Sequence, residues 1–192
     1  KYHLGHVHAT LGPNFELPEN WLDDELLTTQ VSANYDHVVM REDIPVNLTA
    51  TALVTHAYLY TGEEKYRNWV LEYTEAWMER MEKNGGIIPD NIGPTGHIGE
   101  NRQGQWWGGF YGWTCRFAPG IISCALAVAA ECAHLVSGDN RYLQFLRAHL
   151  DMLLDRSEER DGQLLVPSRH LDDGWQDFAP LGIMEPIHLW AV

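Results

Sequence analysis

A repeat with a period of 76 residues constrains the fold of this chain more than any other feature. Gly62 corresponds to Gly138 and Tyr66 to Tyr142, within a turn of pattern Thr/Ser-Gly-Asp/Glu-x-Lys/Arg-Tyr. Each turn joins an apolar segment to a second segment whose hydrophobic residues recur at helical spacing. The repeat therefore predicts two helical hairpins.

The two helices of each hairpin differ in character. The first helices, over 48–60 and 121–136, are apolar nearly all round, so we expect neighbours to cover every face. The second helices are amphipathic, with apolar positions at Tyr66, Trp69, Val70, Tyr73 and Trp77, and at Tyr142, Phe145, Leu146, His149 and Leu153. Gly62 and Gly138 suit the left-handed position that ends a helix.

This pattern predicts an all-α fold in one domain over 1–192, which is part of a longer array. Its parts are an irregular segment 1–45, a hairpin 46–83, a Gly/Trp-rich loop 84–119, a second hairpin 120–156, and a loop with the start of a further helix 157–192. Within the first part, residues 21–27 suggest a short helix and residues 35–41 an extended segment or loop. We expect the long segments after the hairpins to meet at one end of the helices.

The Gly/Trp-rich loop carries the strongest functional signal. Residues 84–113 include nine glycines, and five aromatic residues fall within eight positions: Trp106, Trp107, Phe110, Tyr111 and Trp113. Loops this long are uncommon unless they are functional or disordered, and so many aromatics argue against disorder. The loop is either an ordered connector that packs its own aromatics or an aromatic platform for a flat ligand.

Composition excludes several classes of partner. The chain has 192 residues, 45% of them hydrophobic, which suits one domain with a substantial core. A net charge of -14 opposes nucleic-acid binding, so no nucleic-acid partner is expected. The least polar stretch, 117–138, contains Glu131, His134 and Pro119, so it predicts a buried helix and no membrane association.

The three cysteines predict free, buried thiols. Cys124 and Cys132 are eight residues apart on one predicted helix, about 12 Å along its axis, which is too far for a disulfide. With Cys115 the count is odd, which favours a reducing, cytoplasmic location. The sequence contains no signal peptide, but it starts without Met, so a preceding segment can be missing.

The turns 61–66 and 137–142 and the Trp106–Trp113 segment resemble the six-hairpin glycosidase-like superfamily. The resemblance covers Leu48 to Trp175, about two thirds of the chain. The superfamily contains (α/α) toroid enzymes: glycoside hydrolases, unsaturated-uronide hydrolases and polysaccharide lyases. The resemblance implies a helical hairpin array that is part of an (α/α) toroid, and a carbohydrate-active enzyme without a cofactor.

For a glycoside hydrolase acting on an oligo- or polysaccharide, the sequence offers both parts of a site. Trp106, Trp107, Tyr111 and Trp113 supply rings on which sugars stack, and Asn91, Arg102, His170 and Asp173 supply polar contacts. Glycoside hydrolysis typically uses two carboxyl groups. We expect Asp90 and Glu100 to be that pair, with His97 as a further catalytic residue. Asp172, Asp173 and Asp177 are the reserve.

Two alternatives remain open. A polysaccharide lyase needs a base and a group that stabilises negative charge. His97 or His170 with Tyr111, and Arg102 or Arg169 with Asn91, are candidates for these roles. A non-catalytic α-solenoid binding module is the other alternative, because repeat arrays commonly bind partners.

The remaining histidines do not predict a metal site. His3, His6 and His8 lie close together, but no nearby cysteine completes a zinc ligand set. His56 and His134 lie within apolar helices and are expected in the core. Asp36, His37 and Arg41 form a polar cluster that either lines the same opening or caps it. The oligomeric state is not predicted.

Overall fold

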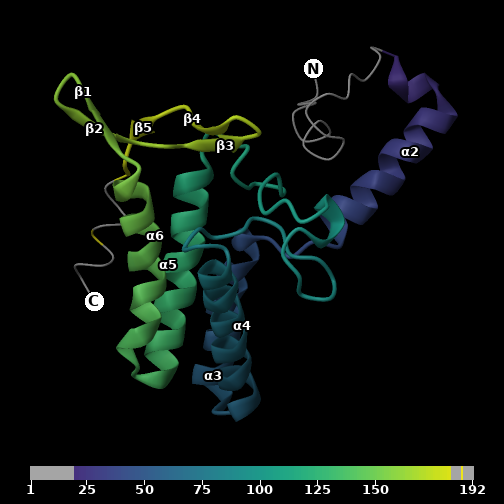
Figure 1. Ribbon diagram of the computed structural model, residues 1–192. Helices are drawn as coiled ribbons and strands as arrows, with labels where there is room; N and C mark the ends of the chain where they lie inside the picture. The colour runs from purple at the N-terminus through teal and green to yellow at the C-terminus, as the bar shows by residue number, and fades with distance from the viewer. Residues whose placement is uncertain (1–19, 183–186, 188–192) are drawn as a thin grey trace.

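Four helices packed side by side form the body of the molecule (Figure 1). The computed structural model describes residues 20–182 and residue 187, with only the backbone described for His37 and Val38. The helices form two hairpins, α3 (Ala50–Thr61) with α4 (Glu64–Lys83), and α5 (Ala118–Ser137) with α6 (Leu143–Asp155). The described strands lie across the end of the body where α6 terminates, and α2 (Glu25–Tyr35) projects away from it.

The repeated turn has the same chemistry in both hairpins. Gly62 and Gly138 are left-handed, with φ of 69° and 72°, which confirms their prediction as helix ends. The hydroxyl before each glycine donates to a carbonyl one turn earlier: Thr61 to Ala57, and Ser137 to Ala133. The same hydroxyls accept from the backbone amides two residues later, at 3.2 Å and 3.1 Å. The motif needs Thr or Ser because a hydroxyl satisfies both ends of the turn.

Helix α5 is the centre of the core and packs against α3, α4 and α6. Ile122, Leu126 and Ala130 on α5 are buried, as are Leu146 and Leu153 on α6. By length and composition α5 is able to cross a membrane, a property shared by core helices of soluble proteins. In this structure it is the element around which the other three helices pack.

The predicted burial of both first helices is wrong for α3. Within α3 only Thr51 and Thr55 are buried, whereas Leu53 is 75% exposed and Tyr60 is 95% exposed. His56, predicted in the core, is also exposed. In the described part of the chain α3 has neighbours on one side, so an apolar composition did not mean coverage on every face.

The prediction of an all-α fold is wrong, because two antiparallel sheets follow α6. The first sheet has the order β1 (Glu158–Arg160), β2 (Gln163–Val166), β5 (Ala179–Pro180). The second pairs β3 (Arg169–Leu171) with β4 (Gly174–Gln176). Arg160 pairs with Gln163, and Leu171 with Gly174, so both hairpins have two-residue turns. The range 157–180 is therefore strand and turn rather than loop, and the chain is not an all-α toroid.

The N-terminal described segment is more helical than the sequence indicated. A 3-10 turn, η1 (Trp21–Asp23), precedes α2, and Asp24 caps α2 by accepting from the Leu27 amide. A π-helical turn, η2 (Asp36–Met40), continues α2 where an extended segment or loop was predicted. Another 3-10 turn, η3 (Pro45–Thr49), leads into α3. Two further 3-10 turns lie later in the chain: η4 (Glu100–Arg102) in the Gly/Trp-rich loop, and η5 (Asn140–Tyr142) directly before α6.

Candidate functional site

Asp90 holds two parts of the Gly/Trp-rich loop together, because every partner of its carboxylate lies within that loop. Its carboxylate is fully buried and accepts from the backbone amides of Gly108 at 3.0 Å, Gly109 at 2.8 Å and Trp113 at 2.6 Å. The side-chain amide of Asn91 donates the fourth hydrogen bond, at 3.0 Å. Burial raises the pKa of the Asp90 carboxyl, and these hydrogen bonds oppose the rise. Both oxygens are thus saturated by the loop that Asp90 holds.

The glycines of the loop make this close approach possible. A Cβ on Gly112 would lie 2.0 Å from Oδ2 of Asp90, and a Cβ on Gly109 would lie 2.0 Å from the Asp90 carbonyl oxygen. A larger residue at either position would displace the carboxylate from the amides that bind it. Several glycines in the sequence therefore serve packing around one buried acid.

An aromatic cluster forms where the loop meets the second hairpin of strands. We define it as Trp106, Trp107, His170 and Trp175. The His170 ring lies 4.6 Å from Trp106, 4.7 Å from Trp107 and 4.9 Å from Trp175, measured between centroids. All four side chains are half-buried, so part of each reaches the surface. Trp113 lies beneath the cluster, 4.9 Å from Trp175, and is fully buried.

Hydrogen bonds join the two segments that carry the cluster. The backbone amide of His170 donates to the Trp113 carbonyl at 2.8 Å, and Arg169 Nε donates to the Thr114 carbonyl at 3.0 Å. Arg169 and Arg116 both form ion pairs with Asp177. The expectation that the two long segments meet at one end of the helices is confirmed by these contacts.

The environment of His170 favours its neutral form. Burial lowers the pKa of His170, and the nearby charge of Asp172 opposes that change. Its Nδ1 is buried and has no hydrogen-bond partner among the described residues. Asp177 differs, because its bond with Arg169 lowers the pKa of the Asp177 carboxyl and keeps it ionised. The segment that carries His170 and Trp175 thus combines a neutral imidazole with an ionised carboxylate.

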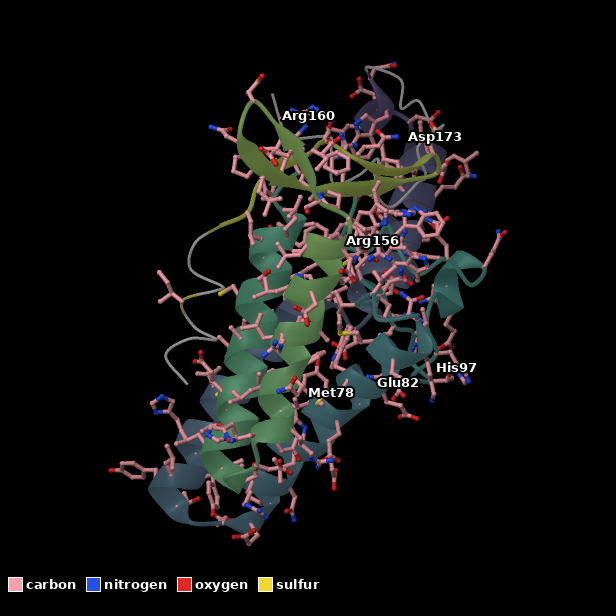
Figure 2. All side chains as sticks on the ribbon, turned by 60° about the vertical axis from the view of Figure 1, so that its left-hand side comes forward. Met78, Glu82, His97, Arg156, Arg160 and Asp173 are labelled. Carbon is pink, nitrogen blue, oxygen red and sulfur yellow. The ribbon has the colours of Figure 1, made fainter. Side chains whose placement is uncertain are left out.

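The three predicted catalytic residues do not lie together in the aromatic cluster. Asp90 is buried beneath the loop, whereas Glu100 and His97 are exposed. The Thr95 hydroxyl lies 2.7 Å from both Glu100 Oε2 and His97 Nδ1, and its bond lowers the pKa of the Glu100 carboxyl. Figure 2 shows His97 well apart from Asp173, which lies on the β3–β4 turn.

The predicted substrate-binding residues separate into three groups. Trp106, Trp107 and His170 belong to the aromatic cluster. Asn91, Arg102 and Trp113 are structural: Asn91 binds Asp90 and the Gln105 carbonyl, Arg102 pairs with the buried Glu42, and Trp113 donates to the Ile88 carbonyl. Tyr111 and Asp173 are exposed, and Tyr111 has a φ of 55°, unusual for a bulky residue.

Sequence reasoning missed Trp175 and Glu42. Trp175 follows the run Asp172-Asp173-Gly174, a turn signal that predicts a strand on each side of it. Glu42 has a side chain only 1% exposed that pairs with Arg102 at 3.1 Å. Burial raises the pKa of the Glu42 carboxyl, and Arg102 opposes the rise. No sequence signal marked Glu42, since its partner lies sixty residues away.

The histidines considered for a metal lie outside the described residues, whereas the three cysteines lie within them. His3, His6 and His8 are not among them, and within the described chain no group of three or more His, Cys, Asp or Glu side chains is placed to hold a metal ion. The three cysteines are free, as predicted, but none is fully buried: Cys115 and Cys132 are half-buried, and Cys124 is exposed. His134 is half-buried, and Asp36 pairs with Arg41 at 2.9 Å on the surface.

Comparison with known proteins gives a family without an assigned activity. A family described as a domain of unknown function (DUF8034) matches residues 14–164. No curated protein and no solved structure matches the chain significantly. The matched range includes the four packed helices and the Gly/Trp-rich loop, and it ends within β2.

Proposed function

We propose that this chain, which belongs to the family described as a domain of unknown function (DUF8034), is a carbohydrate-active enzyme that binds an oligo- or polysaccharide on its aromatic cluster. The observation that carries the proposal is the convergence of three half-buried tryptophans on His170 from two distant segments. Aromatic rings offer apolar faces for sugar rings, while neighbouring polar groups take the hydroxyls. The resemblance of the turns and the Trp106–Trp113 segment to carbohydrate-active enzymes supports the same function.

Glycoside hydrolysis is the reaction we propose first. It requires two carboxyl groups near the bound sugar, one protonated and one ionised. Asp172 and Asp177 both lie in the segment that supplies His170 and Trp175 to the cluster. The charge of Asp172 acts on His170, and Arg169 keeps the Asp177 carboxyl ionised. Asp90 is committed to four internal hydrogen bonds. We therefore assign the carboxyl roles to Asp172 and Asp177.

A lyase reaction on a uronate-containing glycan is the second candidate, because His170 suits a base. A histidine with a lowered pKa is neutral near pH 7 and is able to accept a proton. Arg169, the residue before His170, supplies the positive charge that would stabilise the negative charge formed in this reaction. The two reactions give different products, so one assay separates them.

The first experiment measures binding of the full chain to a panel of soluble glycans. Trp107→Ala is expected to weaken the affinity for the bound glycan by about tenfold, since a stacked ring is lost. Trp69→Ala is the matched control, because Trp69 is a 39% exposed tryptophan on α4, outside the cluster. Circular dichroism must show both variants folded. Equal affinity in the wild type and Trp107→Ala would remove the cluster as the glycan site.

The second experiment identifies the reaction. A hydrolase releases reducing ends, and its activity should collapse in Asp172→Asn or Asp177→Asn. A lyase forms an unsaturated product that absorbs in the ultraviolet, and its activity should collapse in His170→Gln. Binding without either product would make the chain a non-catalytic glycan-binding module instead.

A further inference from the structure

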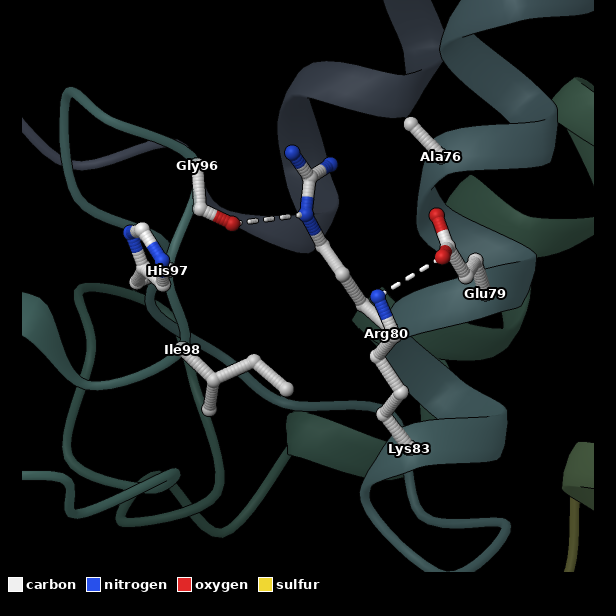
Figure 3. A pocket seen from close by; sticks show the side chains of 7 residues that line it. All are labelled: Ala76, Glu79, Arg80, Lys83, Gly96, His97 and Ile98. Carbon is white, nitrogen blue, oxygen red and sulfur yellow. Dashed lines mark hydrogen bonds and ion pairs between the residues drawn. The ribbon is translucent and has the colours of Figure 1, made fainter.

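A second site lies in a cleft between α4 and the loop 96–98, apart from the aromatic cluster. The cleft has a volume of about 280 Å³, and its lining consists of Ala76, Glu79, Arg80, Lys83, Gly96, His97 and Ile98. Figure 3 shows Arg80 reaching from α4 toward Gly96, with His97 on the same loop as Gly96, across from α4. None of the four cluster residues belongs to this lining.

Arg80 differs from most arginines of this acidic chain, because no described carboxylate pairs with it. Eight of the ten arginines form such ion pairs: Arg41, Arg67, Arg102, Arg116, Arg141, Arg147, Arg160 and Arg169. Arg80 instead donates from Nε to the Gly96 carbonyl at 3.3 Å and lies over the Trp77 ring at 5.7 Å. These contacts hold the guanidinium in place and leave its terminal nitrogens for a ligand. A fixed guanidinium suits a carboxylate or a phosphate group.

Gly96 keeps the space beside the guanidinium open. Its φ is 87°, and a Cβ there would lie 3.3 Å from Nη2 of Arg80. A side chain at this position would crowd the nitrogens that face the ligand. The apolar side chains of Ala76 and Ile98 complete the walls and lower the competition from water.

His97 also lines this cleft, and a chain of hydrogen bonds fixes its ring. The Thr95 hydroxyl donates to Glu100, so its oxygen accepts from Nδ1 of His97 at 2.7 Å. In the neutral ring Nε2 is then the acceptor. An acceptor of this kind binds a hydroxyl group. Lys83, paired with Glu79, contributes an ammonium at the edge of the cleft.

We propose that this cleft binds a small molecule that carries a carboxylate or phosphate group together with hydroxyl groups, such as a sugar acid or a sugar phosphate. Arg80 holds the anionic group and His97 accepts from a hydroxyl. The proposal does not depend on the aromatic cluster or on its reaction.

Calorimetry on the full chain tests this site with three probes: inorganic phosphate, glucuronate and neutral glucose. Binding of phosphate or glucuronate, with none of glucose, is expected for the wild type. Arg80→Gln should weaken that binding by about tenfold, as expected for the loss of charge-assisted hydrogen bonds. Binding of phosphate alone identifies a phosphate ligand, and binding of glucuronate alone identifies a carboxylate ligand.

Two further variants keep the result interpretable. Arg147→Gln removes the same charge from an exposed site on α6 and should bind as the wild type does. Ala76→Glu places a carboxylate one helical turn before Arg80, where it should occupy the guanidinium and abolish binding without removing the Gly96 contact. The proposal is overturned if neither anion binds the wild type, if glucose binds equally well, or if Arg147→Gln weakens binding as much as Arg80→Gln.

Discussion

The four hydrogen bonds that Asp90 accepts predict a structural role that an activity assay alone would miss. In Asp90→Asn the side-chain NH₂ cannot accept, so at least one buried backbone amide of Gly108, Gly109 or Trp113 loses its partner. Leaving such groups unsatisfied costs about 1–3 kcal/mol each. We expect the free energy of unfolding, measured by urea titration, to fall by about 3 kcal/mol.

Asp173→Asn is the control for this prediction, because Asp173 is an exposed turn residue. Its free energy of unfolding should stay within about 0.5 kcal/mol of the wild type. If Asp90→Asn kept full stability and lost turnover instead, Asp90 would act on the substrate and the structural assignment would be wrong.

His149 predicts a loss of stability in mild acid. The side chain is fully buried, its Nε2 contacts Ser123 Oγ at 3.1 Å, and burial lowers its pKa from 6.5 to about 4. Between these two values the unfolded chain binds a proton and the folded chain does not. The contribution of His149 to the free energy of unfolding should therefore be constant above pH 6.5. It should lower that free energy by about 3 kcal/mol as the pH falls to 4.

Urea unfolding of the wild type and His149→Gln across this pH range measures the effect. Glutamine retains a hydrogen-bonding group toward Ser123 but does not titrate, so part of the acid loss should disappear in the variant. Parallel pH profiles for the two proteins would exclude His149 as the source.

At the scale of elements, the left-handed glycines predict how the hairpins respond to substitution. Gly138→Ala forces a side chain into a φ of 72°, which should cost about 1 kcal/mol. Gly120 is the matched control, since it lies in the first turn of α5 with open space around it and without a positive φ. Gly120→Ala should leave the thermal midpoint unchanged or raise it. Equal losses in both variants would contradict the role assigned to Gly138.

The helices were predictable because their signals are local and repeated. The 76-residue period marks both turns, and the predicted apolar positions from Tyr142, just before α6, to Leu153 on α6 are buried as expected. The strands were missed because each is at most four residues long and lacks alternation. Yet a signal existed: Asp161 and Gly162 have φ of 51° and 72°, the two positive values that an Asp-Gly hairpin turn requires.

The site was predictable only in part, for a different physical reason. Residue types identified Trp106, Trp107 and His170, because aromatic rings near a glycine-rich turn suit a surface cluster. They did not reveal that Asp90 and Trp113 are buried, since burial depends on where the loop folds back. A sequence pattern relates residues that are a few positions apart. The contacts that bury Asp90 join it to residues 18 to 23 positions away, so no local pattern revealed them.

For the molecule as a whole, the net charge of -14 means repulsion between like charges, and the ion pairs reduce this repulsion only near each pair. Four glutamates lie at helical spacing on one face of α4, where they line a groove between α4 and α6: Glu72, Glu75, Glu79 and Glu82. Of these, Glu75 and Glu79 have cationic partners, and Glu72 and Glu82 are exposed. Surface ion pairs contribute about 0–1 kcal/mol each. Repulsion among unpaired carboxylates should therefore dominate the response to salt.

Raising NaCl should stabilise this protein, because salt screens repulsion between exposed charges beyond about 10 Å at 0.1 M. We expect the free energy of unfolding to rise by about 1 kcal/mol between low and moderate salt, with a thermal midpoint about 2–4 °C higher. The double variant Glu72→Gln/Glu82→Gln should be more stable than the wild type at low salt and show a flatter salt dependence. A wild-type midpoint that falls with salt would instead mean that attraction between exposed pairs, such as Lys83–Glu79 and Arg141–Glu75, outweighs the repulsion.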